Sequence, residues 1–146
     1  MGLFATGVTV VTAPQDGEVH GMTANAFTSV SLDPPLILVS IDKRARMHSI
    51  LPDVERFGVT VLVSDQEDIS NHFAGQRSQK VIERLEYDWT DGIPVLKGGI
   101  ASMACHLWAS YDGGDHTLFV GRVVHLDASD GDPLLYFRSK YRNIAK

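Results

Sequence analysis

The sequence predicts a mainly β fold, a small antiparallel barrel with short helices. Six or seven segments rich in β-branched and apolar residues are distributed along the 146 residues, and turn-forming residues separate several of them. The helical patterns between these segments are short, and no G-x-G-x-x-G motif follows a strand, which disfavours a doubly wound nucleotide-binding fold. A chain of this length suits one domain, which we expect to span residues 1–146.

The first half of the chain contains four strand candidates, at residues 7–13, 19–32, 36–41 and 57–63. Gln15-Asp16-Gly17 is a hairpin-like turn after the first candidate, and Asp33-Pro34-Pro35 stops the second. Residues 36–41 are almost continuously apolar, so we expect this strand to be buried on both faces.

Two short helices are expected between the strands. Residues 46–51 precede Pro52 and fit one or two helical turns. Ser64, with Glu67 three residues later, is a capping box that opens the second helix, and Gly75 is its natural end.

The second half of the chain is dominated by a hairpin signal. Residues 76–89 are charged and weakly periodic, which indicates a helical excursion or a loop. Two long strand candidates follow at residues 100–111 and 116–126, joined by Asp112-Gly113-Gly114-Asp115. Residues 134–137 predict a last short strand or turn.

Composition and charge exclude several classes of function. Thirteen Lys and Arg residues against eighteen Asp and Glu residues give a net charge of −5, which disfavours a nucleic-acid surface and a polybasic membrane patch. No apolar run approaches the roughly 20 residues that span a bilayer. The single cysteine, Cys105, cannot form an internal disulfide, which fits a reducing compartment. We therefore expect a cytoplasmic protein that contacts neither nucleic acid nor membrane.

Residues 21–32 are the most informative segment for chemistry. In an extended conformation one face carries short donors and acceptors around one aromatic ring: Thr23, Asn25, Phe27, Ser29 and Ser31. Such a surface lets a flat ring with polar edges approach the backbone closely. A solvent-facing strand rich in Ser and Thr explains the same alternation equally well.

Three other places are chemical candidates, each with a structural alternative. Asp42-Lys43-Arg44-Ala45-Arg46 sets cationic side chains beside a helix N-terminus, which suits a phosphate group or is simply a solvated basic turn. His116 opens a strand at a hairpin mouth, where it can donate to a ligand or serve as a surface residue. Phe73-Ala74-Gly75 closes the second helix and is also explained as a core anchor with a helix cap. No C-x-x-C, H-E-x-x-H or P-loop spacing occurs, so no metal site is expected.

The order of several motifs resembles that of the flavin reductase family. The motifs are FATGVTVVT at 4–12, GMTANAFTSVSLDPP at 21–35, FAG at 73–75, GIPVL at 92–96, GDHT at 114–117, GRV at 121–123 and PLLYF at 133–137. The resemblance implies an FMN-binding split β-barrel, usually a homodimer, that transfers hydride from NADH or NADPH to FMN or FAD. Many members supply reduced flavin to a separate flavin-dependent monooxygenase.

The resemblance also implies roles for particular residues. Those implied to line the isoalloxazine ring are Thr23, Asn25, Ala26 and Phe27. Those implied along the ribityl chain and phosphate are Ser29, Ser31, Ser40, Lys43, Arg44 and Arg46. Those implied at the nicotinamide side are Phe73, Ala74, Gly75 and the catalytic candidate His116, with Tyr141 closing the pocket. Family members usually have a helix before the first motif, where this sequence has only Met1-Gly2-Leu3, so we expect that helix to be absent.

Hydride transfer between two stacked rings depends on positioning and exclusion of water and needs no protein nucleophile. A site made of small polar side chains, backbone amides and one histidine is therefore chemically sufficient. The alternative is a flavin- or haem-binding split barrel that stores or senses its cofactor without reductase turnover, because the same polar strand would serve it. A third class, a bare interaction barrel, would bind no flavin.

Overall fold

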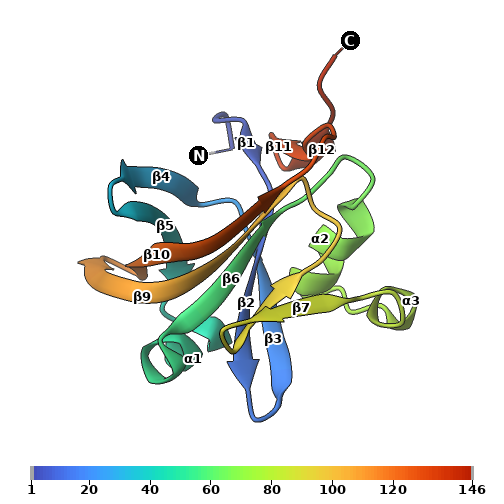
Figure 1. Cartoon of the computed structure of the whole chain (residues 1–146). Helices are drawn as coiled ribbons and strands as arrows, with labels where there is room; N and C mark the ends of the chain where they lie inside the picture. The colour runs from blue at the N-terminus through green and yellow to red at the C-terminus, as the bar shows by residue number, and fades with distance from the viewer. Residues whose placement is uncertain (1, 146) are drawn as a thin grey trace.

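A computed structural model describes residues 2–145 and shows a mainly β architecture with three short helices (Figure 1). The strands are β1 (Thr6–Gly7), β2 (Thr9–Gln15), β3 (Glu18–Ala24), β4 (Phe27–Leu32), β5 (Pro35–Asp42), β6 (Arg56–Val61), β7 (Tyr87–Thr90), β8 (Ile93–Leu96), β9 (Ala101–Gly113), β10 (His116–Ala128), β11 (Leu135–Phe137) and β12 (Lys140–Arg142). The helices are α1 (Arg46–Val54), α2 (Glu67–Phe73) and α3 (Gln79–Ile82).

The main sheet has seven strands in the order β3-β2-β6-β9-β10-β5-β4, and every neighbouring pair is antiparallel. The strands β3 and β4 follow each other in the chain but lie at opposite edges of this sheet. The sheet therefore curls into a barrel that is split between these two edges (Figure 1). Two small sheets, β1-β11-β12 and β7-β8, complete the fold. The predicted split-barrel architecture is confirmed.

The hairpin of β9 and β10 is the longest ladder, with 13 residues in each strand. The predicted turn is correct: Gly114 adopts a positive φ of 81°, which glycine tolerates without strain. Register shifts at Val120/Gly121 and Val123/His125 bend the hairpin around the core. Gly121 is needed at the first bulge, since a Cβ there would lie 2.5 Å from Cζ of the Phe57 ring.

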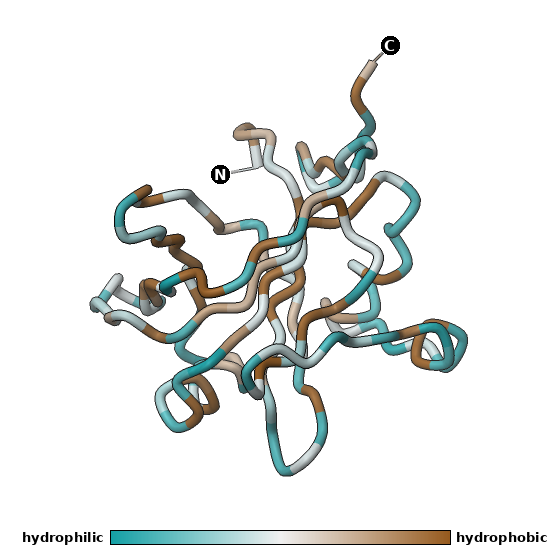
Figure 2. Tube along the Cα trace, in the orientation of Figure 1, coloured by the Kyte–Doolittle hydropathy of each residue, from teal (hydrophilic) through white to brown (hydrophobic). Residues whose placement is uncertain are grey.

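The main core lies inside the curled sheet and is closed at one end by α1. Phe57, Phe119, Met47 and Leu51 are fully buried there. Hydrophobic stretches follow the central strands in Figure 2, while the connecting turns are mostly hydrophilic. Burial of this apolar surface is the main term that favours the folded state.

The expected single strand over residues 19–32 is wrong. The chain leaves β3 at Ala24, whose carbonyl accepts the Thr9 hydroxyl at 2.6 Å, and crosses to β4 through Asn25 and Ala26. The Ala26 carbonyl then accepts the Ser40 N–H at 3.0 Å, from β5, the strand next to the opposite edge of the sheet. The segment changes partners halfway, so the two halves do not share one pair of faces.

Helix boundaries also differ from expectation. The helix α1 continues through Pro52 to Val54, and the Glu55 N–H donates to the Leu51 carbonyl in a left-handed cap. Ser64 does not cap α2, which begins at Glu67 after Gln66. The Gln66 side chain instead accepts the N–H of Val63 at 2.8 Å, so a local side-chain bond replaces the expected capping box.

Three strands were not anticipated. Within the charged segment 76–89, α3 is a single short helix and β7 begins at Tyr87, pairing with β8. The third, β12, pairs with β11 behind the last predicted strand. Each is only three or four residues long, too short for a periodic pattern to identify it.

Candidate functional site

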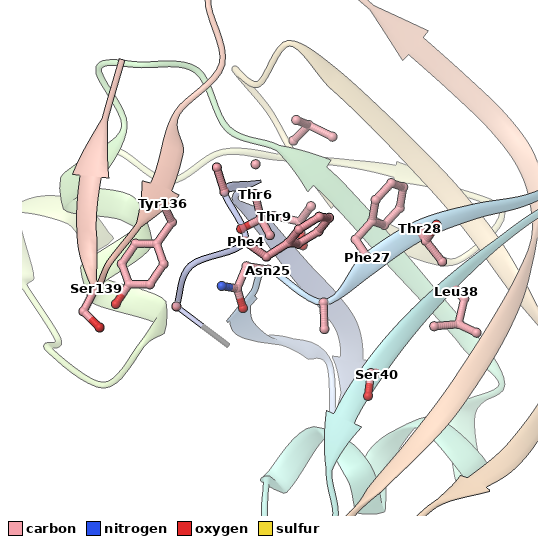
Figure 3. Close-up of a pocket in the computed structure, with 15 residues that line it drawn as sticks. Phe4, Thr6, Thr9, Asn25, Phe27, Thr28, Leu38, Ser40, Tyr136 and Ser139 are labelled. Carbon is pink, nitrogen blue, oxygen red and sulfur yellow. The ribbon is translucent and has the colours of Figure 1, made fainter. Parts of the chain in front are cut away.

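A pocket of about 750 Å³ opens where the β3–β4 crossing meets the C-terminal hairpin (Figure 3). Its lining residues are Gly2, Phe4, Ala5, Thr6, Gly7, Thr9, Asn25, Ala26, Phe27, Thr28, Leu38, Ser40, Val61, Tyr136 and Ser139. Figure 3 shows Tyr136 and Ser139 at one end, Phe27, Leu38 and Ser40 at the other, and Asn25 between them. The volume falls within the roughly 300–1,000 Å³ of typical small-molecule and cofactor sites.

One wall of the pocket comes from β5, which was expected to be buried on both faces. The strand alternates instead: Ile37, Val39 and Ile41 point into the core, whereas Leu38 and Ser40 line the pocket. The almost continuous apolar pattern concealed this division, because Leu38 contributes an apolar side chain to the pocket wall. A strand with one face in the core and one in a cavity gives the same sequence signal as a strand buried on both sides.

The structure brings four of the predicted flavin residues together in this pocket: Asn25, Ala26, Phe27 and Ser40. Thr23 lies elsewhere, because its hydroxyl donates to the Ser70 carbonyl of α2 at 2.6 Å. Thr23 was expected to line the isoalloxazine ring, but it does not line this pocket.

Ser29 and Ser31 also lie outside the pocket lining. Ser29 pairs with Ile37 and Ser31 with Leu36, and a bulge at Val30 separates them. Both positions are further along the β4–β5 ladder than Ser40. The bulge breaks the strict alternation that put these two serines on one face with Asn25.

The pocket also contains residues that the site prediction missed. Thr6 pairs with Tyr136 between β1 and β11, which joins the two ends of the chain beside the pocket. The Thr6 hydroxyl is buried and, within residues 2–145, is the one buried side-chain polar atom without a hydrogen-bond partner. Phe4 and Thr6 belong to the motif at 4–12 that carries the family resemblance, and that motif was the available signal.

These residues fit an isoalloxazine ring. Phe27, Leu38 and Tyr136 supply apolar and aromatic wall, which suits the flat faces of the ring system. Asn25, Ser40 and the unpartnered Thr6 hydroxyl supply donors and acceptors for a polar edge.

The predicted phosphate residues gather beyond Ser40, outside the pocket lining. Lys43 pairs with Asp112, and Arg44 pairs with Asp42 at 2.9 Å. The hydrogen bonds from Arg44 hold the pKa of Asp42 well below its usual range. Arg46 is the first residue of α1. Two of the three expected cations are therefore already paired with carboxylates.

His116 lies with this charged cluster rather than in the pocket lining. It pairs with Asp42 across the β10–β5 ladder, and its Nδ1 is 2.8 Å from the Asp115 carboxylate. The Lys43 N–H donates to the Asp115 carbonyl at 2.9 Å, which holds the hairpin mouth against the end of β5. His116 is two residues from Leu118, the partner of Ser40 in the same ladder.

Phe73, Ala74 and Gly75 form the end of α2, on the β3 side of the fold and outside the pocket lining. Phe73 packs directly on β3, since a Cβ at Gly21 would lie 2.6 Å from its Cε1 atom. Gly75 has a φ of 112°, a conformation that favours glycine.

Tyr141 connects α2 to the pocket wall at Tyr136. Its hydroxyl lies 2.6 Å from the Ser70 hydroxyl and donates to the Asn71 side chain at 3.0 Å, both on α2. Its ring meets Tyr136 edge-to-face at 5.3 Å between centroids. Tyr141 is not itself a lining residue, but it supports a lining residue and ties the C-terminal hairpin to α2.

Replacing Tyr141 by phenylalanine is expected to lower the free energy of unfolding by about 1–2 kcal/mol. The change keeps the ring contact but removes both hydrogen bonds, and it leaves the hydroxyl of the fully buried Ser70 without its partner. Urea unfolding measures the effect. Tyr111→Phe, at an exposed position, is the matched control. A Tyr141→Phe variant as stable as wild type would contradict this role.

Other chemistry is constrained by what the described residues contain. Burial raises the pKa of Cys105 to about 12, so this side chain stays a thiol at neutral pH. Within residues 2–145, no group of three or more His, Cys, Asp or Glu side chains is arranged to hold a metal ion. No helix in that range is long and apolar enough to cross a membrane.

A split antiparallel barrel with a ring-sized pocket at the opening between its edges defines the class of flavin-binding split-barrel proteins. The chain belongs to the flavin reductase family: it matches the flavin reductase like domain over residues 1–145.

Individual relatives agree with this assignment. The chain is 46% identical to an NADH-dependent flavin reductase of Rhodococcus sp over 147 residues, covering 99% of this chain and 82% of the relative. It is 41% identical to the reductase component of 4-hydroxyphenylacetate 3-monooxygenase of Thermus thermophilus, covering 97% and 90%. The structure of the Streptomyces globisporus NADH:FAD oxidoreductase SgcE6 in complex with NAD and FAD fragments matches with a TM-score of 0.90 and 39% identity, covering 99% and 88%.

Proposed function

We propose that this protein is a flavin reductase that transfers hydride from NADH to FMN or FAD. The observation that carries the proposal is the pocket, in which a largely apolar wall and a few polar groups at Asn25, Ser40 and Thr6 match the faces and edge of an isoalloxazine ring. The names of these relatives support NADH as the donor and a flavin, FAD among them, as the acceptor.

The residues of the chain act by binding and orientation. When bound, the nicotinamide supplies the hydride and the flavin accepts it. Asn25, Ala26 and Phe27 hold the ring from the β3–β4 crossing, while Thr6 and Ser40 bond its polar edge. The apolar wall keeps water from the reacting faces, which leaves positioning as the principal contribution of the protein.

The charged cluster beyond Ser40 serves the anionic part of the ligands. Arg46 offers its guanidinium at the start of α1, and Lys43 and Arg44 contribute after exchanging their carboxylate partners for phosphate. His116, at the edge of the same cluster, orients the nicotinamide or stabilises negative charge on the reduced flavin. The Phe73-Ala74-Gly75 motif forms the remaining nicotinamide contact.

We also propose a homodimer. Leu32 is 92% exposed and Phe4 is 78% exposed, and Phe4 is also a wall of the pocket, so a second copy would cover apolar surface next to the ligand. Sedimentation that finds a fully active monomer of 16.0 kDa would contradict the dimer.

The proposed biological role is to deliver reduced flavin to a separate monooxygenase in the cytoplasm. The Thermus relative, named as a reductase component, supports the oxygenase partner. The unpaired, buried Cys105 fits a reducing compartment.

Anaerobic mixing of the purified protein with FMN and NADH tests the function. We expect the yellow flavin absorbance to bleach at a rate proportional to protein concentration. Bound flavin that stays yellow would identify the storage or sensor alternative, and a protein that binds no flavin would identify an interaction barrel. Repeating the assay with NADPH and with FAD ranks the donors and acceptors.

A further inference from the structure

We propose that His72 is a positioning residue for NADH: its imidazole holds the loop after α2, which carries Ala74 and Gly75, in the shape that receives the nicotinamide. The inference rests on the proposed function, which places Phe73-Ala74-Gly75 against the nicotinamide ring. It names the side chain that holds this motif in its shape.

The contact that carries the inference is a hydrogen bond from backbone to side chain. The Ser78 N–H donates to Nδ1 of His72 at 2.9 Å, and His72 is only 7% exposed. An imidazole nitrogen accepts a hydrogen bond only when it carries no proton, so the ring is neutral with its proton on Nε2. Burial, and secondarily the Arg77 charge, lowers the pKa of His72, which keeps the ring in this form.

This bond fixes the C-terminal end of the loop, beyond the backbone hydrogen bonds that tie its first residues to α2. The N–H groups of Ala74, Gly75 and Gln76 all donate to carbonyls in the last turn of α2. The N–H of Ser78 is four residues past Ala74 and is held by His72. The Ser78 hydroxyl in turn accepts the Val81 N–H at the start of α3. His72 therefore fixes the point at which the loop enters the next helix.

The ring of His72 also supports the first residue of the motif. It meets Phe73 edge-to-face, with 4.9 Å between ring centroids and 82° between ring planes. Phe73 is fixed on its other side by Gly21 of β3, where no side chain larger than hydrogen fits. Contacts with His72 and with β3 therefore hold Phe73, the first residue of the motif, in place.

The outer side of the loop is open. A Cβ built on Gly75 would meet nothing within 4 Å, and Ala74 through Arg77 are exposed. A loop that is anchored by His72 and β3 and exposed on its outer side can receive a flat ring against its backbone. Without the Nδ1 acceptor, the Ser78 N–H loses its partner and the loop samples other shapes, so NADH must select the competent one.

A pair of substitutions separates the acceptor from the bulk of the ring. In His72→Asn, the amide oxygen replaces Nδ1 as acceptor, whereas His72→Leu fills the space and accepts nothing. We expect His72→Leu to raise KM for NADH roughly tenfold, the size of effect that follows from losing one buried hydrogen bond. We expect kcat and the FMN dissociation constant to stay within about twofold, and His72→Asn to restore most of the KM.

His125→Leu is the matched control, since His125 is half-exposed and bonds Asp127 at 3.0 Å away from the loop. An unchanged KM in His72→Leu, or a KM in His72→Asn as high as in His72→Leu, would overturn the inference. If His72→Leu does not fold, amide hydrogen exchange of wild type decides. A protected Ser78 N–H that NAD⁺ protects further supports the role, whereas rapid exchange, or protection that NAD⁺ does not increase, refutes it. A wild-type protein that reduces no flavin would instead refute the proposed function.

Discussion

Replacing Ala26 by tryptophan is expected to raise the dissociation constant for FMN at least about a hundredfold, because the indole occupies space that the isoalloxazine ring requires. Ala26 lines the pocket and is exposed, so the larger side chain enters the cavity without displacing the core. Its structural contribution, the carbonyl that accepts the Ser40 N–H at 3.0 Å, belongs to the backbone and survives the change.

Quenching of flavin fluorescence measures this binding, and thermal unfolding checks that the variant is folded. Ala128→Trp is the control, since it places the same indole at the exposed end of β10, outside the pocket lining. A folded Ala26→Trp variant that binds FMN like wild type would show that flavin binds elsewhere.

Replacing His116 by alanine is expected to lower kcat/KM for NADH by about tenfold or more, the effect of losing one hydrogen bond of about 1.4 kcal/mol in the transition state. The fold should be unaffected, because the side chain is partly exposed and its one described hydrogen bond is to the neighbouring Asp115. Ladder bonds to β5 and β9 are made by the backbone and remain.

The control for this variant is His106→Ala. The two histidines are similarly exposed, at 38% and 44% of the side chain, and each is paired with an aspartate, but His106 faces Asp91 on the β7–β8 turn. Steady-state assays with NADH varied at saturating FMN give the comparison. Equal kcat/KM values for wild type and His116→Ala would remove His116 from the site.

Features decided by neighbours in the chain could be predicted from the sequence. The β9–β10 hairpin follows from two long β-rich stretches around Gly113 and Gly114, and the β2–β3 turn follows from Asp16 and Gly17, both with positive φ. These signals are local, because turn residues and side-chain alternation act over a few positions.

Features decided by distant partners could not be predicted in this way. The break at Asn25 depends on Thr9 holding one side and Ser40 the other, and the same break directs this segment into the pocket. The wall at Tyr136 exists because β11 pairs with β1 at the other end of the chain. Alternation within one segment contains none of these pairings, which explains why Asn25 lines the pocket while Thr23, expected on the same face, bonds the Ser70 carbonyl instead.

The family motifs supplied part of what local physics lacked. They put Ala26 and Ser40 among the expected flavin residues, and both line the pocket, although neither side chain has a distinctive pattern on its own. They did not reveal that Lys43 and Arg44 are already paired with carboxylates. The Lys43–Asp112 pair depends on how the end of β9 lies beside the end of β5, and the Arg44–Asp42 pair depends on the conformation of the turn after β5.

The most direct test is a crystal structure of the protein grown with FMN. We expect the three-ring system to lie between the Asn25–Phe27 crossing and Tyr136, with a polar ring atom within hydrogen-bonding distance of the Thr6 hydroxyl. Ordered flavin at any other place, with this cavity filled only by solvent, would contradict the account.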